Sequence, residues 1–200
     1  MATETGQTSR RDEATAALLD AAERLLIKDG HAGLTTRRVA AEAGLNHGLV
    51  HYYFGSMEEL LLQVLERFTA RLTERQRTMY ESEAPFIEKW RTAMQWLGDD
   101  VRGGYAKVWW ELQAMAWNHP EMRERVIGVD AEWRSVVGSG IEAAIAEYGL
   151  DPEEFPADVL LTLVFTFNKG MQTEQMAGIS TGHEQLAAWI DRWIVGLEKG

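Results

Sequence analysis

The chain of 200 residues contains no cysteine, only four prolines and no run of eighteen apolar residues. The lack of cysteine excludes disulfide bonds and thiolate metal sites. A membrane-spanning helix needs about 20 predominantly apolar residues, so we expect no contact with a membrane. The N-terminus is polar and lacks the apolar segment of a secretory signal, so we expect a cytoplasmic protein.

Strands have little support in the sequence, because no segment alternates cleanly between apolar and polar residues. Apolar residues recur instead at helical spacing, for example at Leu18, Ala21, Ala22 and Leu25. Hydrophobic residues make up 46% of the chain, which is enough for a substantial core. We therefore predict an all-α fold, with a small N-terminal helix-turn-helix domain and a larger C-terminal helical domain.

Glycine, proline and capping side chains mark where the helices begin and end. The pattern predicts helices over residues 12–29, 36–43, 47–53, 57–80, 86–99, 104–118, 120–149, 156–178 and 183–198. We expect a disordered arm over residues 1–10, a helix-turn-helix domain over 11–56, and a helical regulatory and dimerisation domain over 57–200.

The net charge of −11 at first argues against a nucleic-acid partner. The acidity is concentrated in the larger part of the chain. Residues 1–56 carry six Lys or Arg against seven Asp or Glu, whereas residues 57–200 carry fourteen against twenty-four. Because the N-terminal part is not strongly basic either, we expect a weaker nonspecific attraction to phosphate than in a basic DNA-binding module.

The segment over residues 35–54 predicts two short helices joined by a tight turn at Gly44-Leu45. Val39 and Ala40 are expected to face inward from the first helix, and Val50 and Phe54 from the second. A DNA-reading helix-turn-helix has this layout, and its second helix enters the major groove. An ordinary helical hairpin with a core of aromatic residues is the alternative.

Several side chains of this segment could contact DNA. Tyr and His offer hydrogen bonds to phosphate, Leu49 could pack on a thymine methyl, and Gly48 permits close approach of the backbone. Arg37 and Arg38 lie where the first helix would cross the phosphate backbone. The candidate DNA contacts are Thr35, Arg37, Arg38, Asn46, His47, Gly48, Leu49, His51, Tyr52 and Tyr53.

At this point the chain resembles the TetR family of transcriptional regulators, over about residues 14–68. The residues that carry the resemblance are Ala21-Ala22-Glu23-Arg24-Leu25, Asp29-Gly30, Val39-Ala40, Ala43-Gly44-Leu45, Gly48, Tyr52-Tyr53-Phe54 and Glu59-Leu60. The resemblance implies a homodimer that reads a palindromic operator on double-stranded DNA. It also implies a small-molecule effector that binds the C-terminal domain and releases the DNA, so that the protein acts as a repressor.

Four positions depart from the pattern of that family. Met57 stands where the family usually has a lysine that contacts phosphate, and His47 stands where lysine or arginine is common. Leu49 and His51 replace the usual threonine and tyrosine. The absence of two basic contacts bears on DNA affinity and not on the fold.

The C-terminal part contains all eight tryptophans, and three of them lie in the run from Val108 to Trp117. An apolar cavity with a few polar groups is typical of a small-molecule site, so we expect one here for an apolar or aromatic effector of unknown identity. The alternative is that these aromatic residues simply fill a helical core. The candidate ligand contacts are Trp110, Gln113, Trp117, Phe165, Asn168, Met171 and Gln172. Glu111, beside several indoles, would favour a cationic ligand or is a solvated or paired carboxylate.

The last two predicted helices carry more apolar surface than one chain needs to bury, so we expect them to form the dimer interface as a four-helix arrangement. The alternative is packing within one chain. The candidate interface residues are Leu163, Phe167, Trp189, Ile190, Trp193 and Ile194.

No phosphate-binding glycine loop and no metal-ligand spacing occur in the sequence. We therefore expect no catalytic residues, no metal, no cofactor and no enzymatic activity. The favoured hypothesis is a ligand-responsive DNA-binding transcriptional regulator, and the alternative is a helical ligand-binding or interaction protein with a degenerate DNA-reading segment.

Overall fold

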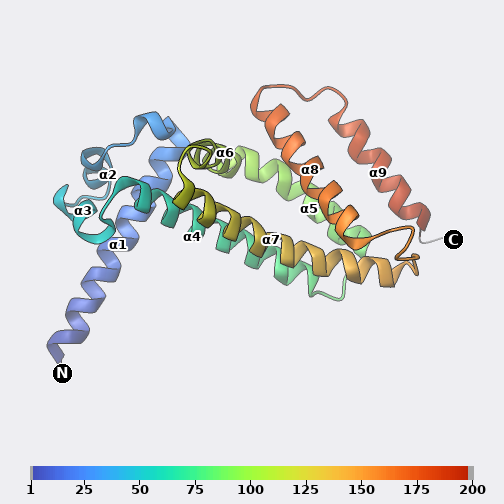
Figure 1. The fold of residues 1–200 in the computed structure, drawn as a ribbon, viewed down its shortest axis with the longest axis horizontal. Helices are drawn as coiled ribbons and strands as arrows, with labels where there is room; N and C mark the ends of the chain where they lie inside the picture. The colour runs from blue at the N-terminus through green and yellow to red at the C-terminus, as the bar shows by residue number, and fades with distance from the viewer. Residues whose placement is uncertain (1, 198–200) are drawn as a thin grey trace. The chain divides into compact units, whose positions relative to one another are not determined.

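The computed structural model describes residues 2–197, and the fold in this range is built from helices alone, so the predicted all-α class is confirmed (Figure 1). The α-helices are α1 (Ala2–Asp29), α2 (Thr36–Glu42), α3 (Gly48–Phe54), α4 (Met57–Tyr80), α5 (Phe86–Arg102), α6 (Tyr105–Ala116), α7 (Pro120–Glu147), α8 (Ala157–Met176) and α9 (His183–Leu197). A short 3₁₀ helix, His31–Gly33, lies between α1 and α2.

The ends of these helices lie close to the predicted ones except at the start of the chain. The structure begins α1 at Ala2, whereas the sequence analysis expected a disordered arm over residues 1–10. That segment contains no proline, so its covalent geometry allows the helix to continue. At the other end, residue 198 of the predicted last helix lies outside the described residues.

The chain divides into two compact units. The first contains the residues up to Phe68 together with Lys107–Ile127, and the second contains Thr69–Ala106 and the residues from Gly128 onward. The predicted domains, 11–56 and 57–200, follow the order of the chain. The compact units instead share α4, α6 and α7, each of which contributes residues to both.

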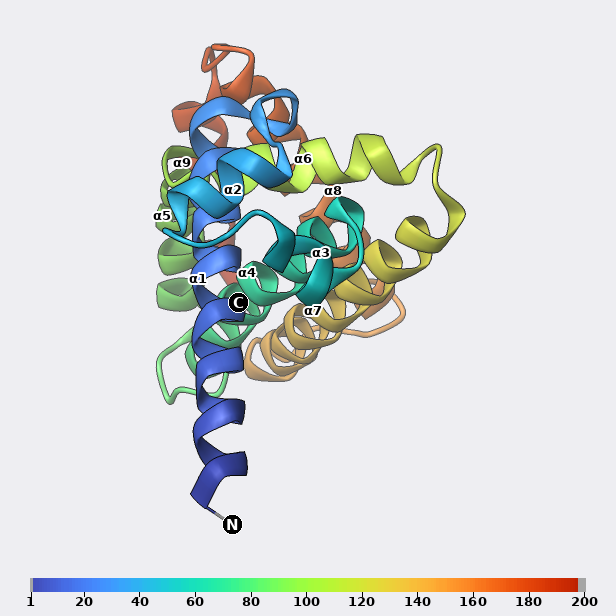
Figure 2. The ribbon, with the colours of Figure 1, turned by 90° about the vertical axis from the view of Figure 1, so that its left-hand side faces the viewer.

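The first unit is organised around the apolar stripe of α1. α2 packs against α1, and α3 packs against α2 (Figures 1 and 2). The core residues that these helices and the first half of α4 bury are Leu18, Leu19, Ala21, Ala22, Leu25, Leu26, Val39, Ala40, Val50, Phe54, Leu60, Leu61, Leu62, Val64 and Leu65. Val39, Ala40, Val50 and Phe54 are therefore buried as the sequence predicted.

The second unit has a core of its own, formed by Val137, Ile141, Ile145 and Phe165 with partly buried side chains from α4, α7 and α8 around it. α8 and α9 both pack on α5. Both of the last two helices thus lie against α5, and all three helices line the cavity of this unit.

One close approach in this unit requires glycine. A Cβ atom at Gly140 of α7 would lie 2.3 Å from Cδ1 of the Tyr80 ring, closer than real Cβ atoms come to other atoms. The Tyr80 ring is buried, and that burial raises the pKa of its hydroxyl to about 12. Gly140 thus allows a ring of α4 to pack directly on the backbone of α7.

We expect Gly140→Ala to lower the free energy of unfolding by about 1–3 kcal/mol, because the added methyl group overpacks this contact. Gly128→Ala in the same helix is the matched control, since a Cβ there meets no atom within 4 Å. The control should be neutral or stabilising by up to about 1 kcal/mol, as alanine favours helix. Urea unfolding of both variants measures the difference, and equal stability would contradict the close approach.

Candidate nucleic-acid interface and apolar cavity

The turn between α2 and α3 is fixed by hydrogen bonds that the sequence encodes. Thr35 caps α2, its Oγ1 accepting the Arg38 N–H at 3.2 Å. Gly44 has φ +68°, the left-handed region that glycine adopts without strain. The Leu45 N–H donates to the Ala40 carbonyl at 2.8 Å and the Gly44 N–H to the Ala41 carbonyl at 3.1 Å. This pair of bonds is the glycine-terminated helix end of a Schellman motif.

α3 begins at Gly48, one residue later than predicted. Its N-cap residue is His47, which makes no side-chain cap hydrogen bond, and the Asn46 side chain accepts the Gly48 N–H at 2.9 Å. Its inner face holds Val50, which is completely buried, and Phe54. Its outer face holds Tyr52, which is 75% exposed. Because the buried residues fix the rotation of α3 about its axis, His51 and Tyr52 are left on the surface.

Most of the candidate DNA contacts are accessible to a partner. Leu49 and Tyr53 are partly buried, and the Tyr53 ring contacts the Tyr52 ring edge-on with centroids 5.0 Å apart. The exposed candidates are Thr35, Arg37, Arg38, Asn46, His47, Gly48, His51 and Tyr52. The structure thus brings the ten residues together on two adjacent helices and the turns that flank them.

Two of these side chains also have partners within the protein. Arg38 forms an ion pair with Asp29 and donates to the Gly33 carbonyl at 2.7 Å, so its guanidinium holds the end of α1 to the start of α2. The Nδ1 atom of His51 lies 3.1 Å from the Gly55 carbonyl, which leaves Nε2 for another partner. Arg37, the residue before Arg38, is exposed and is a further candidate contact for phosphate.

Ion pairs join α4 to its neighbours in the same unit. Arg67 contacts Asp20 at 2.8 Å and Glu23 at 2.9 Å, both on α1. Arg125 of α7 pairs with Glu59, and also with Glu66 at 2.7 Å. Burial opposes ionisation of Glu59, but hydrogen bonds from Gln63 and Arg125 hold the pKa of its carboxyl below the usual value.

Glu111 has a structural contact that the sequence did not specify. Its carboxylate accepts the backbone N–H of His31, at the start of the 3₁₀ helix that leads to α2. A Cβ atom at Gly30 would lie 2.7 Å from a Glu111 oxygen, so glycine leaves room for this carboxylate. Of the two interpretations of Glu111, the paired carboxylate is therefore the one that the structure supports. Nothing local in the sequence signals a contact between residues 80 positions apart.

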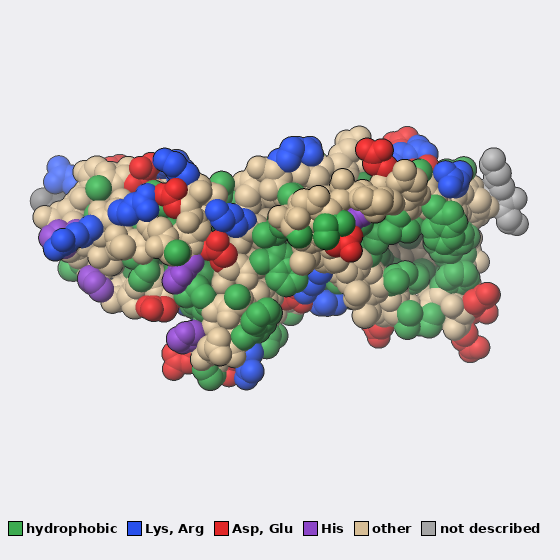
Figure 3. Space-filling model, turned by 90° about the horizontal axis from the view of Figure 1, so that it is seen from above, with side chains coloured by type: hydrophobic (Ala, Val, Ile, Leu, Met, Phe, Trp, Pro, Cys, Tyr) green, Lys and Arg blue, Asp and Glu red, His purple; other side chains and the backbone are tan. Residues whose placement is uncertain are grey.

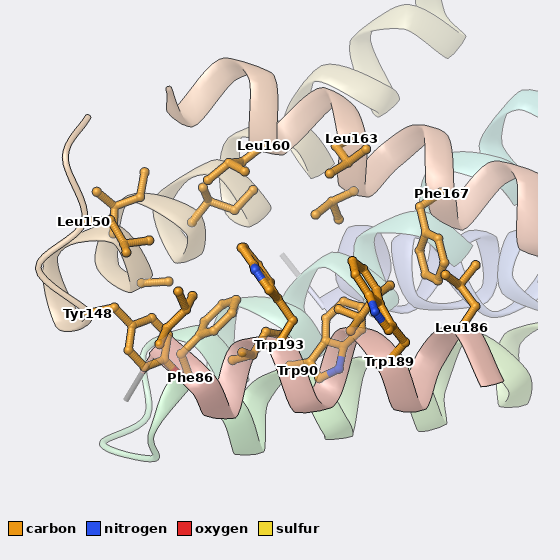
Figure 4. Close-up of a pocket in the computed structure, with 17 residues that line it drawn as sticks. Phe86, Trp90, Tyr148, Leu150, Leu160, Leu163, Phe167, Leu186, Trp189 and Trp193 are labelled. Carbon is orange, nitrogen blue, oxygen red and sulfur yellow. The ribbon is translucent and has the colours of Figure 1, made fainter. Parts of the chain in front are cut away.

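The second unit contains a cavity of about 410 Å³ lined by side chains of α5, α7, α8 and α9 and of the segment that follows α7. Figure 3 shows hydrophobic side chains around a hollow at the right of the view. In the close-up, Trp189 and Trp193 of α9 lie opposite Leu160, Leu163 and Phe167 of α8 (Figure 4). No Asp, Glu, Lys, Arg or His is among the described residues that line it.

All six candidate dimer residues line this cavity: Leu163, Phe167, Trp189, Ile190, Trp193 and Ile194. They differ in exposure, which is 64% for Leu163, 58% for Trp189, 44% for Trp193 and only 4% for Ile194. Phe167 and Ile190 are partly buried. The exposed members are therefore available to a partner chain, whereas Ile194 belongs to the base of the cavity.

The candidate ligand contacts lie elsewhere. Trp110, Gln113 and Trp117 belong to the first unit, and Trp117 is 68% exposed. The other four belong to the second unit, where Asn168 is partly buried and the three buried ones are Phe165, Met171 and Gln172. None of the seven lines the cavity of about 410 Å³, and their role as ligand contacts stays a prediction.

Two further properties of the described residues bear on function. No helix within residues 2–197 combines the length and the apolarity that crossing a bilayer requires. Among the same residues, no three His, Asp or Glu side chains gather where they could hold a metal ion.

Comparison with known proteins identifies relatives of the N-terminal region. The family model for bacterial regulatory proteins of the tetR family matches residues 18–64, from α1 into α4. The HTH-type transcriptional repressor Rv3405c of Mycobacterium tuberculosis is 39% identical over 75 residues, which is 38% of either protein. The sequence match thus spans well under half of this curated relative.

Solved structures extend the likeness to nearly the whole chain. The transcriptional regulator FadR from Bacillus subtilis, solved with stearoyl-CoA, aligns with a TM-score of 0.73 over 90% of this chain and 97% of that one, at 16% identity. The multidrug binding protein EbrR, solved with imidazole, aligns with a TM-score of 0.62 over 92% and 93% of the two chains, at 25% identity. At 16% identity, the likeness to FadR establishes the fold alone.

We expect Thr35→Ala to lower the free energy of unfolding by about 1 kcal/mol, because the Arg38 N–H loses its capping acceptor. Hydrogen exchange at the Arg38 amide should accelerate at the same time. Thr36→Ala is the matched control, since it removes the same hydroxyl from the next position, inside the helix, and should be neutral. Equal effects of the two changes would show that the cap contributes nothing specific.

Proposed function

This chain belongs to the TetR family of bacterial regulatory proteins, and from that premise we propose that it is a DNA-binding transcriptional regulator controlled by a small molecule. In this proposal α3 enters the major groove of an operator, and α2 lies across the phosphate backbone. The protein acts as a homodimer on a palindromic site. It represses transcription until an effector binds the second unit and releases the DNA.

The observation that carries the proposal is the division of α3 into a buried and an exposed face. Val50 and Phe54 anchor the helix, while Tyr52, His47 and Gly48 remain exposed. Tyr52 donates its hydroxyl to a phosphate or a base edge, and Leu49 supplies apolar contact to a thymine methyl. Arg37 supplies a cation for the phosphate backbone, and Gly48 admits the backbone close to the DNA.

Dimerisation is supported by the apolar surface of α8 and α9. Val159 and Leu163, one turn apart on α8, are 61% and 64% exposed, and Trp189 of α9 is 58% exposed. Contiguous exposed apolar surface of this kind marks an interaction site in a protein that is not aggregating. A two-fold axis between two copies presents two α3 helices to half-sites about 34–36 Å apart, which makes the operator palindromic.

Control by a small molecule is supported by what the structural neighbours bind. FadR was solved with stearoyl-CoA, and EbrR is named a multidrug binding protein. The relative from Mycobacterium tuberculosis is named a repressor, which supports repression over activation. An effector releases DNA only if it binds the DNA-free conformation more tightly, by about 1.4 kcal/mol for each tenfold loss of DNA affinity.

A degenerate DNA-reading segment is the alternative function. It is favoured by the ion pair of Arg38 with Asp29, and by His47 and Met57 at positions where the family usually has lysine or arginine. This alternative predicts ligand binding without specific DNA binding. Discrimination between an operator and a scrambled duplex separates the two functions, because the salt-dependent attraction to phosphate is independent of sequence and only a true operator complex prefers one sequence.

Tyr52→Ala should weaken operator binding roughly tenfold or more, a loss of about 1.4 kcal/mol or more, without a change in fold, since the side chain is exposed.

Arg37→Gln should lower the slope of log affinity against log salt by about 1. Arg102→Gln, the same charge removal at an exposed arginine of the second unit, is the control and should leave the slope unchanged.

The measurement is fluorescence anisotropy on an operator obtained by selection from genomic fragments, with a scrambled duplex beside it. Wild-type affinity in Tyr52→Ala would remove the role given to this residue. Absence of any discriminating fragment would favour the degenerate segment.

Val159→Glu should raise the dimer dissociation constant at least thirtyfold, about 2 kcal/mol, because an unpaired carboxylate would be buried in the interface. Ala143→Glu adds the same charge at an exposed position of α7 and serves as the control. Sedimentation equilibrium gives both values. A Val159→Glu protein that dimerises like the control would exclude α8 from the interface.

A further inference from the structure

His51 and Gly55 are joined by two hydrogen bonds at the end of α3. The Gly55 N–H donates to the His51 carbonyl at 2.9 Å, and Nδ1 of the His51 ring lies 3.1 Å from the Gly55 carbonyl. Gly55 has φ +73°, in the left-handed region that glycine adopts without strain. The ring is therefore held through one of its two nitrogen atoms, although His51 itself is exposed.

The hydrogen bond to Gly55 fixes which ring nitrogen of His51 carries the proton. A carbonyl oxygen only accepts, so Nδ1 has to be the donor. Neutral imidazole has a single N–H, and its other nitrogen has a lone pair that accepts. In neutral His51 the remaining atom, Nε2, is thus an acceptor with no proton to donate. The sequence alone, which suggests phosphate as the partner of histidine, does not specify this polarity.

Few groups of duplex DNA can donate to such an acceptor. Phosphate oxygens accept, and so do N7 and O6 of guanine, N7 of adenine and O4 of thymine. The donors in the major groove are the amino groups at N6 of adenine and at N4 of cytosine, and each base pair presents one of them. Neutral His51 therefore has no direct hydrogen bond to offer to phosphate, but it matches an amino group.

Neighbouring candidate contacts have the opposite polarity. The Oδ1 atom of Asn46 accepts the Gly48 N–H at 2.9 Å, which leaves the amide NH₂ of Asn46 as a donor for DNA. Arg37 and Arg38 carry guanidinium groups, which only donate. These three side chains suit phosphate oxygens and base acceptors, so they do not compete with His51 for an amino group.

We propose that His51 is a specificity-determining residue that binds the amino group of an adenine or a cytosine in the major groove. The proposal rests on the proposed function, since it requires α3 in the groove, and it adds the chemical group that is recognised. At one position of each half-site, the strand that faces His51 carries adenine or cytosine. Guanine and thymine are disfavoured there, because each would place an acceptor against Nε2.

The first test is selection of operators from randomised duplexes by the wild-type protein and by His51→Ala, at about pH 8, where histidine side chains are ordinarily neutral. The wild type should enrich adenine or cytosine at one position of each half-site, and His51→Ala should lose that preference alone. The same amino group is then removed from one half-site by a base analogue that lacks it. Wild-type affinity should fall about three- to tenfold, the loss of one hydrogen bond, whereas His51→Ala should bind both duplexes equally.

Two further substitutions at this position separate an acceptor from a donor. His51→Gln keeps an acceptor in its side-chain carbonyl and should retain part of the sensitivity to the amino group. His51→Lys supplies only donors, so it should be insensitive to the amino group while the slope of log affinity against log salt steepens by about 1. His119→Ala removes an exposed histidine outside α2 and α3, and this control should behave like the wild type. A purely structural role of His51 would change the affinity for all duplexes alike.

Heteronuclear NMR of the free protein tests the hydrogen bond without DNA, and an Nε2–H tautomer of neutral His51 would overturn the proposal. So would a wild-type protein that loses no more affinity than His51→Ala when any amino group is removed. A discriminating operator without this coupling to His51 would reject the contact and keep the proposed function. Failure of the wild type to discriminate any duplex would instead reject the proposed function, and the contact with it.

Discussion

A helix of seven residues is too short to be stable alone in water, and both α2 and α3 have that length. Their existence depends on burying Val39, Ala40, Val50 and Phe54 against the rest of the first unit. That burial fixes the rotation of each helix, so it also decides which side chains remain exposed. The surface proposed to read DNA is therefore a consequence of core packing, and the polar residues on it are free to vary without loss of the fold.

In the second unit the exposed residues are instead apolar, because its last two helices carry apolar residues on more than one face. Ile194 is buried in the base of the cavity, whereas Leu163, Trp189 and Trp193 remain substantially exposed. Within residues 2–197 no further element of the same chain covers them.

Local features of the sequence predicted most of the fold. The left-handed glycines at positions 30, 44 and 55, the Thr35 cap and the hydrogen bond from the Gly48 N–H to Asn46 can be predicted, because each acts within a few residues. The buried pair Val50 and Phe54 follows from helical spacing alone. What periodicity does not encode is which helices meet, such as α5 and α9, whose Arg91 and Asp191 are 100 residues apart. The cavity depends on such pairings. The sequence predicts a dimer interface from the α8 and α9 residues of its lining, and it does not single out the α7 residues of its base.

The few cations on the proposed DNA-binding surface bear on how strongly an effector has to lower the affinity for DNA. Arg38 is engaged with Asp29 and His47 replaces a basic residue, so few fixed cations contribute to phosphate binding. In the proposed DNA complex, specific affinity then depends on neutral groups such as the Tyr52 hydroxyl, and the nonspecific part of the affinity is small. A ligand that shifts a two-state equilibrium has to supply a differential affinity equal to the shift. Each buried methylene contributes about 0.8 kcal/mol, so two or three methylenes bound only in the DNA-free state lower DNA affinity by roughly tenfold or more. Under the proposed function, a modest apolar effector is therefore sufficient to control a regulator whose binding to DNA has a small electrostatic component.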